Sequence, residues 1–76
     1  MTKKQQKKLA KQFAELEFKL QHATEDEEIR LLENKIIALT ESTQADMDFA
    51  DMDAVDAMVR EMLREKNSWL ENLKNF

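Results

Sequence analysis

The 76-residue chain contains neither glycine nor proline. These two residue types normally make up about 12% of a protein, because they provide the positive φ angles and the fixed kinks that tight turns need. A sheet of several strands requires several such turns. The sequence therefore predicts an all-α fold, in which helices are joined by loops of Ser, Thr, Asn and Asp.

The short chain also limits the hydrophobic core. A core of this size supplies only about 3–5 kcal/mol of net stability unless a disulfide, a bound metal or self-association adds to it. No cysteine is present to form a disulfide, and one histidine without cysteine excludes the usual zinc frameworks. We therefore expect a single helical domain over residues 1–76 that gains further stability from self-association or from a partner.

Apolar residues spaced alternately by three and four predict a first helix over about residues 2–22. Thr2 and Gln5 form a capping box at its start. A second capping box, Thr24 with Glu27, predicts a second helix over about residues 25–41. We expect that helix to end near Glu41, because the Thr and Ser residues around it favour turns over helix interiors. The apolar stripes of the two helices are Leu9, Phe13, Leu16 and Leu20, and Ile29, Leu32, Ile36 and Leu39.

A third helix is predicted over about residues 46–74. Its start is open, since Thr43, Asp46, Asp48 and Asp51 can all cap a helix. A capping box at Ser68 allows a short separate helix after Asn67, but we favour one long helix because the apolar stripe keeps its phase there. That stripe consists of Met52, Val55, Val59, Met62, Trp69, Leu73 and Phe76, and Lys66 alone interrupts it.

The loop between the first two helices has only two or three residues, so these helices form an antiparallel hairpin. At 1.5 Å per residue they are about 30 and 25 Å long, whereas the third helix reaches about 43 Å. The third helix should therefore overhang the hairpin. The expected fold is an antiparallel hairpin plus a longer third helix, either a compact three-helix bundle or one completed by dimerisation.

Several apolar residues lie where the hairpin cannot cover them. At 100° per residue, Phe18 lies about 170° from the mean direction of the first stripe. Met58 widens the apolar face of the third helix, whereas Met52 and Met62 are expected in the core. We predict a homodimer, formed through the third helix and its overhanging end. The predicted interface residues are Phe18, Met58, Trp69, Leu70, Leu73 and Phe76.

Charge is distributed unevenly along the chain. Residues 1–20 carry six Lys against two Glu, whereas residues 21–44 and 45–76 each have a net charge of −4. We expect the basic start to be neutralised by the acidic run and by the negative end of the second helix. The basic patch is Lys3, Lys4, Lys7, Lys8 and Lys11. The acidic patch is Asp46, Asp48, Asp51, Asp53 and Asp56.

No residue pattern indicates catalysis, a cofactor or a metal. The single His22 has no cysteine to pair with, and a histidine at a helix C-terminus is favourable for structural reasons. Counted from Asp46, the EF-hand positions that need Gly and Glu hold Asp51 and Ala57, so the Asp run does not match a calcium loop. The chain also lacks a glycine loop for a nucleotide. We therefore expect no catalytic, cofactor-binding or metal site.

The function that the sequence favours is a non-enzymatic protein-interaction module, such as a small regulator, adaptor or immunity-type protein. Trp69, Leu73 and Phe76 would be its apolar anchors, and the acidic patch would set orientation and association rate. The alternative is a nucleic-acid-associated protein that uses the basic patch. No apolar run approaches the roughly 18 residues of a membrane span, and no signal-peptide pattern is present. We therefore expect a cytoplasmic protein without a membrane span.

Overall fold

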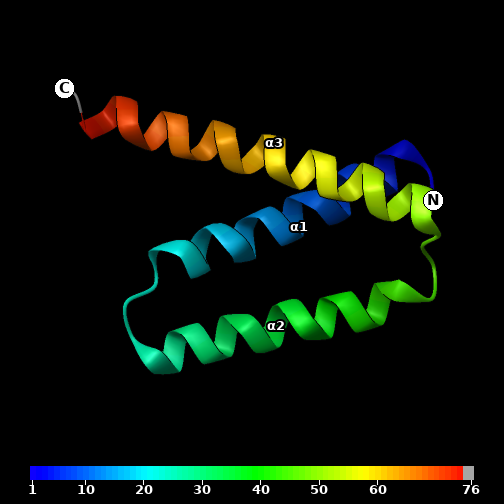
Figure 1. Ribbon diagram of the computed structural model, residues 1–76, viewed down its shortest axis with the longest axis horizontal. Coiled ribbons are helices and arrows are strands. Elements are labelled where there is room, and N and C mark those ends of the chain that lie inside the picture. Colours follow the sequence, from blue (N-terminus) through cyan, green and yellow to red (C-terminus); the bar gives the residue numbers. More distant parts are fainter. Residues whose placement is uncertain (75–76) are drawn as a thin grey trace.

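Three helices make up the computed structural model, which describes residues 1–74 (Figure 1). They are α1 (Lys3–His22), α2 (Asp26–Gln44) and α3 (Phe49–Lys74). α2 runs antiparallel to α1, and α3 runs back in the direction of α1. The predicted all-α fold, a helical hairpin followed by a longer third helix, is confirmed.

The predicted capping box begins α1. The Gln5 amide donates to the Thr2 hydroxyl over 3.2 Å, and the Thr2 amide donates to the Gln5 side chain over 3.0 Å. Because Thr2 is the cap and has an extended backbone, α1 itself starts at Lys3. At the other end, Ala23 is also extended and its amide donates to the Leu20 carbonyl, which stops the helix.

Both predicted boundaries of α2 need correction. The Thr24 capping box does not form: Glu25 is the N-cap and has no side-chain capping bond, and its extended backbone delays the helix to Asp26. Three acids in the first turn, Asp26, Glu27 and Glu28, complement the helix dipole there.

The C-terminal end of α2 lies at Gln44 rather than near Glu41. Its Thr and Ser side chains do not break the helix, because their hydroxyls donate to carbonyls one turn back. The Thr40 hydroxyl donates to the Ile36 carbonyl over 2.8 Å, and the Thr43 hydroxyl donates to the Leu39 carbonyl over 2.8 Å. These bonds satisfy the hydroxyls inside the helix, so the chain continues for another turn.

α3 starts at Phe49, three residues later than predicted. Asp48 is its cap: the Asp51 amide donates to the Asp48 carboxylate over 2.8 Å, and the Asp48 amide donates back to Asp51 over 3.4 Å. This reciprocal arrangement is a capping box built from two aspartates. α3 is continuous through Asn67 and Ser68.

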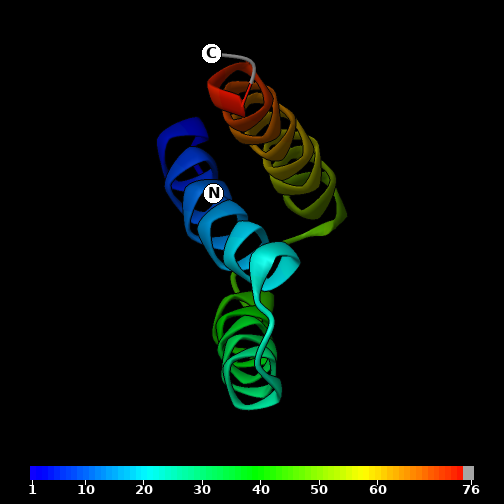
Figure 2. The same cartoon turned by 90° about the vertical axis from the view of Figure 1, so that its left-hand side faces the viewer.

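α1 is the central helix, and the other two lie on different sides of it. It packs against both α2 and α3, but within residues 1–74 these two do not approach each other. Seen along the helices, the three lie nearly in a row with α1 in the middle (Figure 2). The molecule measures 42 × 28 × 15 Å, so it is little thicker than one helix with its side chains, about 10–12 Å.

The core lies mainly between α1 and α3. Its buried side chains are Leu9, Ala10, Ala14, Val55 and Val59. Ala10 and Ala14 are both 0% exposed, and such small residues allow the two backbones to approach closely. α2 contributes one buried residue, Leu32. Met52, predicted to be core, is exposed, because α2 and α3 do not pack against each other.

The open arrangement leaves more surface in water than a compact chain would. The accessible surface is 6122 Å², whereas a compact 9.0 kDa monomer exposes about 4,900 Å². The radius of gyration is 13.7 Å against about 11.4 Å for a compact chain of this length. The excess surface, about 1,200 Å², is larger than the roughly 800 Å² that each partner contributes to a standard interface.

Candidate functional site

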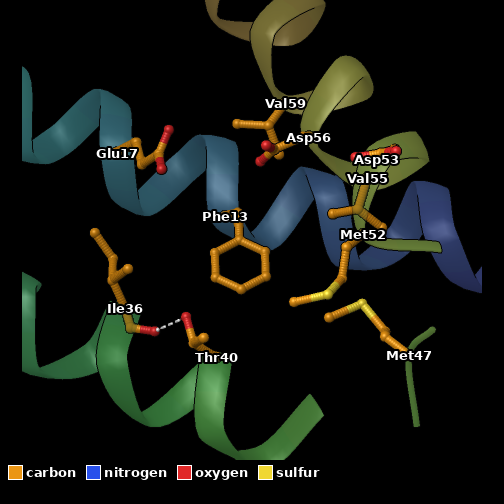
Figure 3. Close-up of a pocket in the computed structure, with 10 residues that line it drawn as sticks. All are labelled: Phe13, Glu17, Ile36, Thr40, Met47, Met52, Asp53, Val55, Asp56 and Val59. Atoms are coloured by element: carbon orange, nitrogen blue, oxygen red, sulfur yellow. Dashed lines mark hydrogen bonds between the residues drawn. The ribbon is translucent and has the colours of Figure 1, made fainter. Parts of the chain in front are cut away.

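A groove opens where all three helices face one another (Figure 3). Its volume is about 250 Å³. The Phe13 ring points from α1 into this space, towards Ile36 and Thr40 on α2 and towards the two thioethers of Met47 and Met52. We call it the acid-rimmed groove. Its lining consists of Phe13, Ile36, Thr40, Met47, Met52, Val55 and Val59, with the acids Glu17, Asp53 and Asp56.

The local sequence explains why these side chains meet. Phe13 and Glu17 are four residues apart and therefore share one face of α1. Met52, Val55 and Val59 likewise share a face of α3. Because α2 and α3 are held apart by α1, the side chains that would close the core of a compact bundle line an open groove instead.

The electrostatics of the groove disfavour the charged form of Glu17. Partial burial raises the pKa of Glu17, and the negative charge of Asp56 raises it further. Within residues 1–74 the ion pairs are Met1 with Asp51 and Arg64 with Glu61. The acids of the groove therefore have no salt-bridge partner in the described part of the chain, and a cation placed between them would be stabilised.

The groove continues along α1 and α2. A neighbouring hollow of about 430 Å³ shares Glu17 and Ile36 with it and is otherwise lined by Leu20, Gln21, Glu33 and Ile37. From Phe13 to Gln21 the two hollows together follow nine residues of α1, whose ends are about 12 Å apart along the helix. The site is thus elongated, with carboxylates on the α2 wall, on the α3 wall and, through Glu17, in the middle.

Asp51 belongs to the acidic patch but has a structural role. It is buried, and the Gln6 amide nitrogen donates to it over 2.7 Å while the Met1 ammonium lies 3.4 Å away. The bond from Gln6 lowers the pKa of Asp51, with further lowering from the Asp48 amide and the N-terminal ammonium. Asp51 therefore joins the starts of α1 and α3, and Asp48 caps α3.

Acidification should act on Asp51 and Glu17 in opposite directions. The lowered pKa of Asp51 means that its contribution to stability is present at neutral pH and is lost as pH falls through its folded-state pKa. The raised pKa of Glu17 means that its cost is present at neutral pH and disappears as pH falls to the ordinary glutamate value. The free energy of unfolding should rise slightly towards about pH 4 and fall below it.

Urea titrations across pH test this expectation. Asp51→Asn should remove most of the fall below about pH 4, and Glu17→Gln should remove the slight rise above it. Asp46 is an exposed acid whose carboxylate forms no hydrogen bond or ion pair in the described part, so Asp46→Asn is a matched control that should leave both slopes unchanged. An Asp51→Asn variant with the wild-type acid slope would contradict the assigned role of Asp51.

The predicted interface residues separate into two groups. Phe18 is half-buried against α3: its ring lies 4.6 Å from the His22 ring, and the Lys66 ammonium lies 5.5 Å from its centroid. Met58 packs against the core. Both residues therefore contact their own chain. Phe18 of α1 faces Lys66 of α3, and Met58 of α3 packs against the core that the two helices share.

The end of α3 behaves differently. Trp69 is 64% exposed and Leu73 is 49% exposed, whereas Leu70 is half-buried. Trp69 follows Met62 by seven residues, so it continues the same face of α3 towards its C-terminal end. The overhang is visible in Figure 1. Phe76, the remaining predicted anchor, lies outside the described residues.

The predicted neutralisation of the basic patch does not involve salt bridges in the described residues. All five of its lysines are exposed, and within the described residues none of them forms an ion pair. The start of α1 does lie beside the start of α3, but there Asp48 and Asp51 are engaged by backbone amides, Gln6 and the N-terminal ammonium. The lysines are therefore a separate charged surface.

Sequence reasoning missed most of the acid-rimmed groove. Phe13, Ile36 and Met52 were assigned to core stripes, and Glu17 was not singled out. One signal was present, since Glu17 interrupts the apolar positions between Phe13 and Leu20 on the face of α1 that packs. Whether Glu17 lines a groove or faces solvent depends on where α3 lies, which the sequence does not show.

In residues 1–74, no group of three His, Asp or Glu side chains is arranged to hold a metal ion. None of the described helices combines the length and the apolar character that crossing a membrane requires.

With this geometry in hand, comparisons with known proteins supply no relative to reason from: the chain matches no protein-family model, and neither curated proteins nor solved structures gave a match.

Proposed function

We propose that this protein is a non-enzymatic protein-interaction module whose binding surface is the acid-rimmed groove. One observation carries the proposal: α2 and α3 do not meet within residues 1–74, so the groove between them leaves Met52 exposed and most of its other apolar lining only partly covered, beside three carboxylates. A further helix laid into this space would complete a second layer, the arrangement in which helices normally bury their apolar faces.

The chemistry of the groove supports binding rather than catalysis. Its polar side chains are three carboxylates and the Thr40 hydroxyl, and that hydroxyl already donates to the Ile36 carbonyl. His22 contacts Phe18 near the end of α1 and is not part of the lining. Nucleophilic catalysis requires a general base beside a nucleophile, and the lining of the groove contains no such pair.

Photo-crosslinking in the native host tests the proposed function. A photoreactive amino acid at Met52, inside the groove, should capture a specific protein. The same amino acid at Ala57, an exposed position elsewhere on α3, should not. Equal capture from both positions, or capture of no protein from Met52, would remove the support for the groove as a binding surface.

The basic patch supports a second candidate function, nucleic-acid association, because its five lysines are exposed and form no ion pair in the described part of the chain. The same experiment separates the two functions. A photoreactive amino acid at Lys8 should capture nucleic acid if the alternative holds, with capture that falls steeply as salt is raised. Capture of a protein from the Met52 position does not depend on whether the lysines bind nucleic acid.

Self-association through the overhanging end of α3 is the second part of the proposal. Among the described residues of that end, Trp69 is the most exposed apolar side chain, and tryptophan is enriched among residues whose removal weakens an interface most. Trp69→Ala should weaken dimerisation about tenfold or more, as measured by sedimentation equilibrium.

Phe18→Ala is the matched aromatic variant within the chain. Because Phe18 is half-buried against His22 and Lys66, it should lower the free energy of unfolding by about 2 kcal/mol, roughly half the loss for a fully buried phenylalanine. The dimer constant, corrected for folding, should change little. A wild-type protein that is only monomeric at micromolar concentration, with full helicity and cooperative melting, would refute self-association.

A further inference from the structure

We propose that the acid-rimmed groove binds a cationic amphipathic helix of another protein, whose apolar side chains contact Phe13, Met47 and Met52 and whose lysine or arginine head groups pair with Glu17 and Asp56. This inference rests on the proposed function and names the chemistry of the partner.

The shape of the site favours a helix over a small molecule. Small-molecule pockets usually bury most of the ligand's surface, whereas the acid-rimmed groove is open and continues along α1 into a second open hollow. The two together follow about 12 Å of α1, which is just over two turns of a helix. A helix with apolar residues at i, i+3 or i+4 and i+7 therefore matches the length of the site.

The apolar lining is adaptable. Met47 lies in the connection before α3 and Met52 lies in its first turns, and Figure 3 shows their thioether groups on the same side of the groove. Methionine has several rotatable bonds and a polarisable sulfur, so it adjusts to side chains of different shape. Exposed Ile37 extends the apolar surface along α2. This lining suits leucine-like or aromatic anchors.

The charges that line the site determine which kind of helix should bind. The two hollows are lined by Glu17, Glu33, Asp53 and Asp56, and by no lysine or arginine. The proximity of Asp56 raises the pKa of Glu17, so the two carboxylates repel each other in the free protein. A lysine or arginine between them replaces this repulsion with attraction, in a partly buried position where such pairs are screened less by salt.

A third hollow, separate from the two described above, provides a contrast. It lies between another strip of α1 and α2 and is lined by Lys19 and Lys35 as well as Glu15. Its mixed charge gives no preference for a basic partner. The preference for a cationic helix is therefore specific to the side of the α1–α2 pair that faces α3.

Fluorescence anisotropy with two synthetic peptides tests the inference. Both peptides have about 15 residues, long enough to form a helix when bound, and carry the same leucines at i, i+3, i+4 and i+7; one has lysines at the flanking positions and the other has glutamates. The lysine peptide should bind at least tenfold more tightly. Equal affinity for the two peptides would overturn the inference.

Two double variants show where the lysine peptide binds. Glu17→Gln/Asp56→Asn should weaken its binding about tenfold. Glu41→Gln/Glu71→Gln removes two exposed acids outside both hollows, so it changes the net charge equally and should leave the affinity within about twofold. An equal loss in both variants would show general charge attraction and overturn the inference. Circular dichroism checks that both variants remain helical.

The outcomes also separate this inference from the proposed function. If Met52 captures a host protein and Glu17→Gln/Asp56→Asn does not alter that capture, the groove binds a protein but the cationic chemistry is wrong. If Met52 captures no protein, the proposed function fails as well. If Glu17→Gln/Asp56→Asn dissociates a wild-type dimer, the occupant is a second copy of this chain, and the inference is overturned.

Discussion

Ala14→Leu should lower the free energy of unfolding by about 1–3 kcal/mol, a large part of the roughly 3–5 kcal/mol that a core this small provides. Ala14 is 0% exposed and belongs to the core between α1 and α3. A leucine there has no space to enter, so α1 and α3 must separate and lose contacts at Val55 and Val59. Urea unfolding followed by circular dichroism measures the loss.

The matched control is Ala57→Leu, the same substitution at an exposed position of α3. It should change stability by no more than about 0.5 kcal/mol. If the two leucine variants are equally stable, the close α1–α3 contact is wrong. If Ala14→Leu does not fold, the stability of Ala14→Gly is measured instead. That substitution removes only a methyl group and some helix propensity, so it should lower the free energy of unfolding by about 1 kcal/mol.

Leu32→Ala should release α2 from the rest of the molecule. Leu32 is 5% exposed and is the buried residue of α2, and truncation of such a leucine costs about 2–5 kcal/mol. Because α2 packs against α1 and not against α3, the loss should be local. Hydrogen exchange should show faster exchange of α2 amides, while α1 and α3 amides retain most of their protection.

The adjacent residue provides an unusually close control. Leu31 is 56% exposed, so Leu31→Ala should change stability by no more than about 0.5 kcal/mol and leave α2 protected. Equal effects of the two alanines would contradict the docking of α2 through Leu32. Uniform loss of protection in all three helices would show that α2 is an integral part of one cooperative unit.

Local sequence was a reliable guide where the determining interactions are local. The Thr2 and Gln5 capping box forms as predicted because its partners are three residues apart. The α1–α2 hairpin follows from a short connection, and the continuity of α3 follows from an unbroken apolar period. These features depend on backbone hydrogen bonds within a few turns.

Local sequence was a poor guide where two local signals competed. Thr24 and Glu27 matched a capping box as well as Thr2 and Gln5 did, yet Glu25 is the cap of α2. Thr40 and Thr43 were expected to end the helix, but their hydroxyls bond within it. Each choice differs by about 1 kcal/mol or less, which packing elsewhere can reverse.

The sequence by itself determined three helices, their order and the overhang of α3, because helix formation depends on spacing, caps and the absence of Gly and Pro. Only the tertiary structure decided that α1 is central, so that Phe18 packs half-buried against Lys66 of α3, and Met52 and Glu17 line an open groove. The reason is physical: a helical period shows which residues share a face, but not which neighbour covers that face. Here α3 covers one side of α1, α2 covers another, and the space between them is left for a partner.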